Sequence, residues 1–412
     1  MRVGMVTQWY PPEKIWVPQA VANAISAVSQ DILVVTGTPH YPSGVVEKGY
    51  SPFRFTSEVI DGIKVYRSPE YPYRGAAPLR RLVNYASFAV SSCYSTVRRL
   101  AKVDLLFVYS SPATAALPAM MMRVLFRKPY ILQVQDIWPD SVLDSGFVTG
   151  PGWKRIVRAT LDWFVNRSYR GASHIVVITE SAKALLQSRG VPEDKLTVVY
   201  NWTPDPRSNV ERSAISLRDK LGIGRNRAVF LYAGAIGHPQ GLEDVINAFD
   251  MASVSESAVL VIVGSGVQKP EIEKIASRID GVYVLDQVPI GQAAAWLEES
   301  DVGVVSLADT ELNRATFPSK IQFLCGIGLP ILIRAPGDAS EFVTRNGIGV
   351  GVSAVGLESL AEGFRRLASE RSRSDILTSM GRRSRELFEA EFSEEVGARR
   401  IKAVLDKTLS VT

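Results

Sequence analysis

A lysine near the start of an expected helix is the residue best suited to chemistry. In the stretch Phe317–Leu332, Pro318 suits a first helical turn, because its φ is already helical and no N–H is needed there. Ser319 could bond an unpaired amide of that turn. Lys320 would then lie beside free N–H groups and the positive end of the helix dipole, which favour an anion. The pattern predicts a site for the diphosphate of a sugar nucleotide; a solvated lysine is the alternative.

Two glycine-containing segments follow expected strands in the second half. Residues 232–242 place three glycines between a strand and a helix, where backbone amides can approach a phosphate closely. A tight turn with no ligand is the alternative. Residues 263–269 hold only two glycines of the dinucleotide fingerprint, since Lys269 stands where the last is needed. The first strand also lacks such glycines, which argues against a dehydrogenase.

These residues need a scaffold of alternating strands and helices. Apolar runs of strand length alternate with helical periods, which is the signature of a parallel, doubly wound sheet. The expected strands of the first half are residues 2–7, 31–36, 104–109, 129–134, 173–179 and 196–200. After a polar linker around residues 204–213, the alternation restarts with strands at 228–233, 259–263, 281–285 and 302–306. Ligands of two such halves are expected in a crevice between the carboxyl ends of both sheets.

Length and composition set limits on the class of protein. A chain of 412 residues exceeds one ordinary core, so two domains are expected. Two cysteines in apolar runs indicate a reducing compartment, and three scattered histidines do not form a metal site. The N-terminus enters a strand without a signal-peptide core, and no apolar run is long enough to span a membrane. The expected location is the cytoplasm, attached peripherally to the inner face of the plasma membrane.

Positive charge is concentrated in the first half. The net charge is +5, and the segment from Arg74 to Arg170 holds fourteen basic residues against five acidic ones. Expected helices at 79–102, 120–128 and 153–170 mix arginine with large apolar side chains. Such faces could lie on an anionic bilayer and reach a lipid-linked acceptor. Ordinary solvated helices are the alternative, and nucleic acid is not an expected partner because no recognised binding module is present.

Several short motifs carry a resemblance to a known family. They are Tyr10-Pro11-Pro12-Glu13, residues 36–44 with Gly49-Tyr50, Ser110-Ser111-Pro112, residues 135–141, residues 232–242 and Pro318-Ser319-Lys320. In this order and spacing they resemble the retaining glycosyltransferases of family 4, over essentially the full length. The nearest likeness is to the branch that adds deoxy or amino sugars in bacterial O-antigen, capsule and colanic-acid assembly.

The resemblance implies an α/β chain with the GT-B fold, in which two Rossmann-like, doubly wound domains face each other across a cleft. Residues 1–205 would form the acceptor-binding domain and residues 206–392 the sugar-nucleotide-binding domain. Residues 393–412 would form a C-terminal helix that packs back on the first domain. The implied reaction is metal-independent transfer of a hexose from a nucleotide diphosphate sugar, UDP-linked by expectation, to a lipid-linked saccharide, without a cofactor.

The resemblance also implies roles for particular residues. Lys320 is the expected catalytic cation, and Asp136 would position a sugar or acceptor hydroxyl; the alternative for Asp136 is a helix N-cap. The expected donor-binding residues are Gly234, Gly237, Gln240, Val288, Arg314, Pro318 and Ser319. The expected acceptor-binding residues are Glu13, Gln135 and Trp138.

This sequence departs from the family pattern at four positions. Ala235 and Gln240 stand where many members carry Arg and Lys, and Ala315 and Phe323 stand where many carry glutamates. The second of those glutamates binds ribose, so ribose recognition has no assigned residue here. Two other functions therefore stay open: a sugar-nucleotide epimerase of the same two-domain plan, and an inactive sugar-nucleotide-binding partner.

Overall fold

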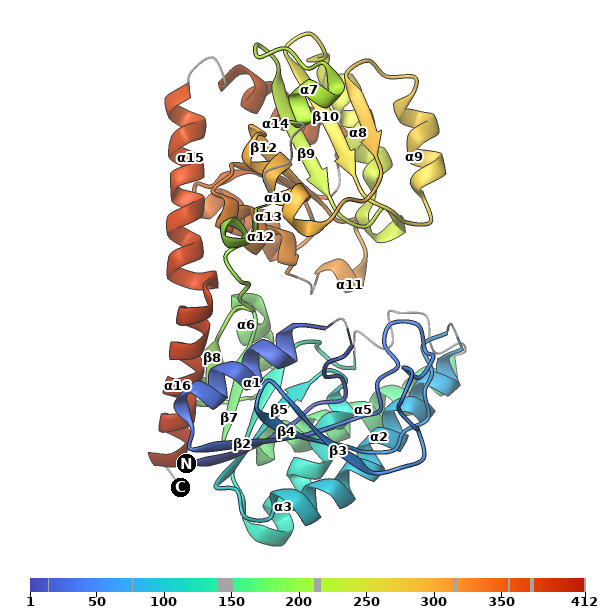
Figure 1. Cartoon of the computed structure of the whole chain (residues 1–412), viewed down its shortest axis with the longest axis vertical. Helices are drawn as coiled ribbons and strands as arrows, with labels where there is room; N and C mark the ends of the chain where they lie inside the picture. The colour runs from blue at the N-terminus through green and yellow to red at the C-terminus, as the bar shows by residue number, and fades with distance from the viewer. Residues whose placement is uncertain are drawn as a thin grey trace. The chain divides into compact units, whose positions relative to one another are not determined.

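Two sheets, each with its own helices, make up the protein in the computed structural model. The described residues are 1–13, 15–75, 77–139, 151–210, 216–314, 317–354, 356–370 and 374–410. Unit 1 comprises Met1–Asn201 with Gly397–Thr412, and unit 2 comprises Trp202–Val396 (Figure 1). The expected domain boundaries, after residues 205 and 392, both fall inside unit 2.

The sheet of unit 1 has the strand order β3-β4-β2-β1-β5-β6-β7-β8. Every neighbouring pair is parallel except β3 and β4, which form an antiparallel hairpin at the edge. Strand β5 is buried along its whole length, as expected of a parallel strand covered on both faces. The strands are β1 (Arg2–Val6), β2 (Asp31–Thr36), β3 (Thr56–Ile60), β4 (Ile63–Arg67), β5 (Leu105–Ser110), β6 (Tyr130–Val134), β7 (His174–Val177) and β8 (Leu196–Val198).

Helices connect these strands and cover the sheet of unit 1. Helix α6 begins after Thr179, whose hydroxyl accepts a hydrogen bond from the Ala182 amide. From Gly397 onward, the last helix belongs to unit 1, where Lys407 Nζ donates to the Asp194 carbonyl oxygen at 2.7 Å. The helices are α1 (Val17–Val28), α2 (Pro78–Leu100), α3 (Leu117–Phe126), α5 (Pro151–Gly171), α6 (Glu180–Ser188) and α16 (Glu394–Ser410), with the short turns η1 (Ala113–Ala116) and η2 (Glu193–Lys195).

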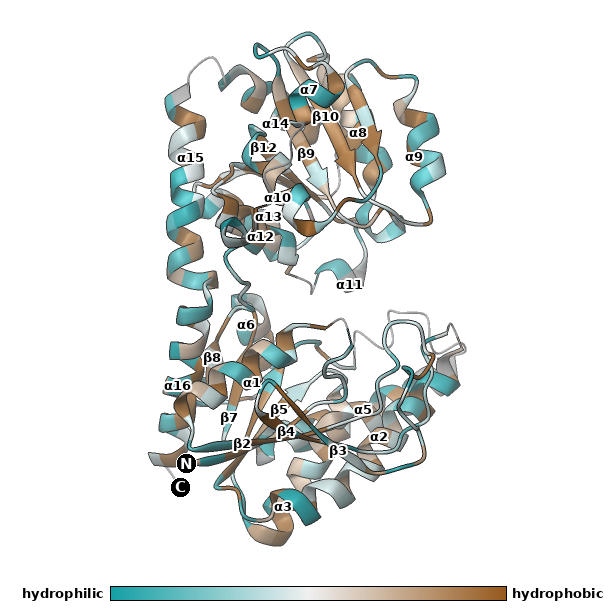
Figure 2. Cartoon of the chain, viewed as in Figure 1, coloured by the Kyte–Doolittle hydropathy of each residue, from teal (hydrophilic) through white to brown (hydrophobic). Residues whose placement is uncertain are grey.

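The sheet of unit 2 is wholly parallel, in the order β11-β10-β9-β12-β13-β14. Its labelled strands are coloured mainly hydrophobic in Figure 2, whereas α9 (Lys269–Ala276) and α15 (Ser374–Leu387) carry much hydrophilic colour. This is the pattern of a buried parallel sheet behind amphipathic helices. The strands are β9 (Ala228–Ala233), β10 (Ala258–Val263), β11 (Val282–Leu285), β12 (Val302–Ser306), β13 (Ile331–Arg334) and β14 (Gly349–Val352).

The helices of unit 2 include three that the sequence analysis left unassigned, within residues 338–387. Helices α13 (Asp338–Arg345) and α14 (Leu357–Glu370) pack against β13 and β14, and α15 (Ser374–Leu387) packs against α12 (Ser319–Ile327). With β14, they complete the second doubly wound fold. The expected α/β class with two Rossmann-like domains is thus confirmed. The elements are α7 (Leu217–Leu221), η3 (Pro206–Asn209), η4 (His238–Gln240), α8 (Leu242–Ala252), α9 (Lys269–Ala276), α10 (Ile290–Glu298), α11 (Glu311–Arg314), α12 (Ser319–Ile327), α13 (Asp338–Arg345), α14 (Leu357–Glu370), α15 (Ser374–Leu387) and η5 (Phe388–Phe392).

Candidate functional site

Each sheet has one point at which the order of its strands reverses. In unit 2 the chain runs outward from β9 to β11 and then returns to place β12 on the other side of β9. In unit 1 it returns in the same way to place β5 beside β1. Ligands of doubly wound sheets bind outside the carboxyl ends of the strands at such points. The segments that follow β9 and β12, and those that follow β1 and β5, are therefore the places to look for function.

The turn after β9 is packed directly against the turn after β10. The Gly234 amide donates to the Val263 carbonyl at 2.9 Å, and the Ile236 amide donates to the Ser265 carbonyl at 2.8 Å. A Cβ atom at Gly264 would lie only 1.8 Å from the Gly234 carbonyl oxygen. The glycines of residues 263–269 therefore serve the contact between two turns. This agrees with the expectation that the segment is not a dinucleotide-binding fingerprint.

Lys320 extends from the start of α12 onto the turn after β9. Its Nζ lies 3.7 Å from the centroid of the Tyr232 ring and donates a hydrogen bond to the Tyr232 hydroxyl. That hydroxyl donates in turn to the Ala235 carbonyl oxygen at 2.6 Å. A Cβ atom at Gly234 would approach Lys320 Nζ to 2.7 Å, so only glycine leaves room for the lysine. The ammonium thus lies against the glycine-containing turn and does not point away from it.

The surroundings of Lys320 lower the pKa of its ammonium group. The side chain is half-buried against a fully buried tyrosine. Burial disfavours the charged form of an amine, and it lowers the pKa of Lys320 to about 7. A ligand carrying negative charge would reverse this effect. The sequence pattern placed Lys320 at a helix N-terminus, but it did not indicate that the lysine packs against Tyr232, which lies on β9.

The start of α12 differs in detail from the expectation. Pro318 is the N-cap residue and the helix begins at Ser319, so Pro318 does not occupy the first turn. No side-chain cap hydrogen bond forms there, so the cap role expected of Ser319 is wrong. Within the described ranges, the amides of Gly237 and Ser319 donate no hydrogen bond. Among the described residues, these two N–H groups therefore have no partner within the protein.

Residues at the end of β12 and after it hold the rest of the turn after β9 in place. Ser306 Oγ donates to the Gln240 carbonyl oxygen at 2.6 Å, and Asn313 Nδ2 donates to the Pro239 carbonyl oxygen at 3.0 Å. The buried Arg334, at the end of β13, pairs with Asp244 on α8. The sequence analysis named Gln240 but missed these supporting side chains. The signal that could have found them is a polar residue at the end of an apolar strand.

The other expected donor-binding residues lie in unit 2 with varied surroundings. Arg314 donates from Nε to one oxygen of Asp309 at 2.9 Å and from Nη2 to the other at 3.1 Å, so its charge is already compensated. Val288 is half-buried after β11. Its neighbour Gln287 accepts a hydrogen bond from Ser265 at 2.5 Å. Of the two positions that lack glutamate, Ala315 lies outside the described residues, and Phe323 is half-buried on α12 (Ser319–Ile327).

In unit 1, Glu13 braces the segments that follow β1 and β2. Its carboxylate accepts hydrogen bonds from the amides of Tyr10 at 3.0 Å, His40 at 2.9 Å and Tyr41 at 2.8 Å. Burial raises the pKa of Glu13 to about 7, and the three amides act in the opposite direction. In this structure, Glu13 therefore positions loops, and its acceptor-binding role stays a prediction.

Asp136 is the exposed carboxylate at the end of β6. Its Oδ2 accepts a hydrogen bond from Ser111 Oγ at 2.7 Å, so Asp136 joins the segment that follows β5. The surrounding protein still desolvates the carboxyl enough to raise its pKa, while the Ser111 hydrogen bond and the charge of Arg74 oppose the shift. An exposed carboxylate oriented in this way can accept a hydrogen bond from a ligand hydroxyl.

The two other expected acceptor-binding residues flank Asp136. The side-chain amides of Gln135 and Asn201 exchange hydrogen bonds of 3.1 and 2.8 Å, which ties the turn after β6 to the end of unit 1. Trp138 is buried, its carbonyl accepts a hydrogen bond from Arg189 at 3.1 Å, and its ring lies 5.9 Å from that of Tyr85. A ligand could therefore contact Gln135 and Trp138 mainly through their backbone or the edges of their side chains.

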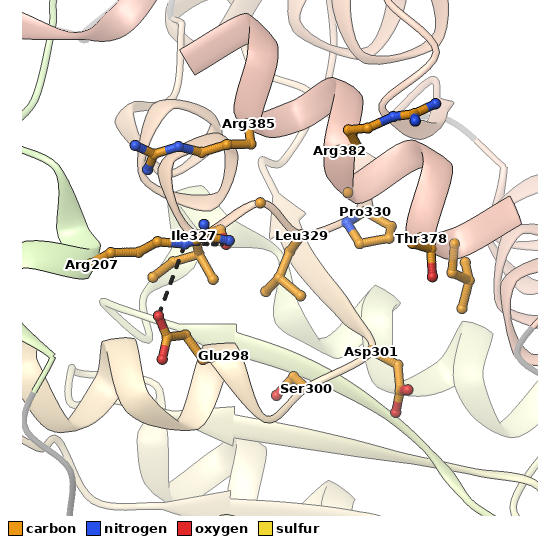
Figure 3. A pocket seen from close by; sticks show the side chains of 13 residues that line it. Arg207, Glu298, Ser300, Asp301, Ile327, Leu329, Pro330, Thr378, Arg382 and Arg385 are labelled. Carbon is orange, nitrogen blue, oxygen red and sulfur yellow. Dashed lines mark hydrogen bonds and ion pairs between the residues drawn. The ribbon is translucent and has the colours of Figure 1, made fainter. Parts of the chain in front are cut away.

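A separate hollow of about 720 Å³ lies at the C-terminal end of α12 (Figure 3). Its arginines already have partners within unit 2. Arg385 binds both oxygens of Asp205, and Arg207 donates to the Ile327 carbonyl oxygen. These contacts fasten the first residues of unit 2 to α12 and α15. Lys320 lies about 10 Å away along the helix axis, so this hollow is not the site beside β9.

Comparisons with known proteins identify the family of both halves of the chain. A family model described as "Glycosyl transferase 4-like domain" matches residues 18–202, and one described as "Glycosyl transferases group 1" matches residues 214–386. The putative colanic acid biosynthesis glycosyl transferase WcaI of Escherichia coli K12 is 28% identical over 354 residues, which cover 83% of this chain and 85% of WcaI. The probable glycosyltransferase WbjE of Pseudomonas aeruginosa is 23% identical over 76% of each chain.

A solved structure supports the fold. Anabaena Alr3699/HepE in complex with UDP superimposes with a TM-score of 0.66 at 15% identity, over 100% of both chains. The two matched domains correspond to the two doubly wound sheets, and together they cover most of the sequence. The chain therefore belongs to the family 4-like, group 1 glycosyltransferases, and it has the GT-B fold that the sequence predicted.

Proposed function

We propose that this glycosyltransferase moves a sugar, deoxy or amino in type, from a nucleotide diphosphate sugar to a lipid-linked saccharide. The product would be a bacterial cell-surface polysaccharide, and the anomeric configuration would be retained. The observation that carries the proposal is the Lys320 ammonium, which lies against Tyr232 and Gly234 at the strand-order reversal of unit 2. Anabaena HepE, with a similar fold, binds UDP, and WcaI is named for colanic acid biosynthesis.

Unit 2 would bind the donor through its diphosphate. As the bond between the sugar and the diphosphate loosens, negative charge grows on the leaving phosphate. Lys320 and the amides of Gly237 and Ser319 are placed to stabilise that charge, as preorganised donors do in a transition state. The acceptor hydroxyl would attack from the same face of the sugar, and the leaving phosphate oxygen would take its proton. None of these steps requires a metal ion.

Unit 1 would bind the acceptor. Asp136 would accept a hydrogen bond from a hydroxyl of the sugar or the acceptor, and Ser111 fixes the orientation of its carboxylate. Gln135 and Trp138 shape the turn that carries it. Glu13 would contribute by holding the neighbouring loops in place.

A lipid-linked acceptor would place the protein at a membrane surface. Within the described ranges, every helix is too short or too polar to cross a bilayer. Helix α2 exposes Leu79 and Val90, at 72% and 67%, and it contains four arginines and no acidic residue. On α5, Trp163 is 68% exposed. Such faces suit contact with anionic lipids, and liposomes containing phosphatidylserine should sediment the protein at low salt but not at high salt.

The decisive experiment combines a donor screen with a transfer assay. UDP, GDP and dTDP, and their sugars, are first ranked by the shift in thermal unfolding temperature. The best donor is then followed by NMR with and without a lipid-linked saccharide. Transfer only in the presence of the saccharide, with retained configuration, supports the proposal. Conversion of the donor alone would indicate an epimerase, and binding of no nucleotide would indicate an inactive partner.

Replacement of Lys320 tests the residue assignment. Loss of one charged partner of the transition state costs on the order of a hundredfold in rate, so Lys320→Ala should lower turnover by about that factor. A variant with nearly normal turnover would remove Lys320 from the mechanism.

A further inference from the structure

Arg74 lies on a row of aromatic rings in unit 1. Its guanidinium carbon is 4.6 Å from the centroid of the Tyr41 ring and 5.6 Å from that of Trp9. The ring of Trp9 lies 5.4 Å from Tyr41 and 6.5 Å from Tyr85. Tyr85 continues the row to Trp138 at 5.9 Å. The segments after β1, β2 and β6 each contribute a ring, so Arg74 is held at the carboxyl ends of the strands.

The charge of Arg74 is not paired within the part of the chain that the structure describes. Among the described residues, no carboxylate forms an ion pair with it. Arg67 offers the contrast, because it lies 5.3 Å from the Tyr50 ring and is also paired with Glu58 at 2.6 Å. The hydroxyl of Tyr85 interacts with the Arg74 guanidinium. A half-buried guanidinium that no described carboxylate pairs with is suited to bind an oxyanion.

Asp136 lies close enough to Arg74 to feel its charge, but the two do not form an ion pair. The positive charge of Arg74 opposes the rise in the pKa of Asp136 and helps to lower that of His40. A ligand that contacted both Arg74 and Asp136 would need an anionic group for the first and a hydroxyl for the second. A sugar that carries a phosphate presents both groups.

We propose that Arg74 binds a phosphate group of the acceptor and thereby selects a phosphorylated saccharide. The planar guanidinium can donate two parallel hydrogen bonds to phosphate, and the aromatic rings keep it in one orientation. This role deepens the proposed function and rests on it in one respect, namely that the ligand of unit 1 is the acceptor. It makes Arg74 a binding residue, whereas the sequence showed it only as one of many positive charges.

The experiment is calorimetric titration of the full-length protein with geranyl diphosphate, in the presence of saturating UDP to occupy the donor site. Arg74→Gln should weaken binding at least about tenfold, in line with losing a charge-assisted pair of hydrogen bonds. Arg80→Gln is the matched control, since Arg80 is exposed and lies 5.7 Å from the Tyr73 ring. That control should bind within about twofold of the parent protein.

Further titrations separate binding through the anion from binding through the lipid chain, and binding at Arg74 from binding at Lys320. Geraniol should bind far more weakly than geranyl diphosphate, because it lacks the anion. Lys320→Ala should leave geranyl diphosphate binding unchanged. Loss of binding in Lys320→Ala with normal binding in Arg74→Gln would overturn the proposal, and so would binding of glucuronate in preference to the diphosphate. An unfolding temperature of Arg74→Gln close to that of the parent protein shows that the fold is intact. Arg74→Lys should retain part of the binding of geranyl diphosphate, because it keeps the positive charge.

The same titrations distinguish this inference from the proposed function. UDP alone should bind Arg74→Gln as it binds the parent protein, because Lys320 belongs to unit 2. If UDP binds neither the parent protein nor the variants, the proposed function is wrong. Binding of geranyl diphosphate by Arg74→Gln and Arg80→Gln is then compared without UDP, and this comparison still decides the role of Arg74.

Discussion

Raising the pH should weaken nucleotide binding, because the cation expected to hold the diphosphate loses its proton near neutrality. Burial against Tyr232 lowers the pKa of Lys320 to about 7 in the free protein. A bound diphosphate would raise that pKa again, since an opposite charge favours the protonated amine. Binding is therefore accompanied by proton uptake. Affinity is highest below the pKa of the free protein and falls as the pH rises above it.

The size of the effect follows from the fraction of protein molecules in which Lys320 is protonated. With a pKa of about 7, about a quarter of the lysines are protonated at about pH 7.5 and about one in a hundred at about pH 9. The apparent Kd for UDP scales inversely with that fraction, so it should rise about twentyfold over this range. The terminal phosphate titrates near pH 6 and is fully ionised throughout, so the nucleotide contributes little.

The assay is calorimetric titration with UDP at several pH values, in buffers of different ionisation enthalpy to count the protons taken up. Lys320→Arg is the matched control, because a guanidinium stays charged over the whole range and should bind UDP with a flat pH dependence. Lys320→Ala should bind weakly and also show a flat dependence. A wild-type Kd that stays constant from about pH 7.5 to about pH 9 would refute the reasoning.

Three further changes test other parts of the structure. Gly264→Ala should destabilise the fold by about 1–3 kcal/mol and weaken UDP binding, because its Cβ would meet the Gly234 carbonyl. Chemical denaturation measures the loss of stability, and an unchanged midpoint would contradict the packing. Glu13→Gln should destabilise by a similar amount, about 1–3 kcal/mol in urea unfolding, because an amide cannot accept all three backbone hydrogen bonds. Asp136→Asn should lower turnover by about tenfold or more while UDP affinity stays the same; a parallel loss of UDP affinity would argue against a role on the acceptor side.

The sequence by itself determined the features that depend on local patterns. Apolar runs gave the strands Ala228–Ala233 and Val302–Ser306 with the bounds that the structure shows. The proline-serine-lysine motif placed Lys320 at the start of a helix, although Pro318 proved to be the cap. Hydrophobic periodicity and helix-start chemistry act over a few neighbouring residues, so they can be read without knowing what packs where.

The contacts that give these residues their chemistry were decided by the tertiary structure. Lys320 and Tyr232 are 88 positions apart in the chain, and they meet only because β12 returns to the side of β9. Arg74 is likewise placed on Tyr41 and Trp9 by the order of strands in unit 1. Strand order and the packing of distant turns bring together side chains that no local pattern connects. Protonation and charge pairing depend on those neighbours, and they are therefore properties of the fold.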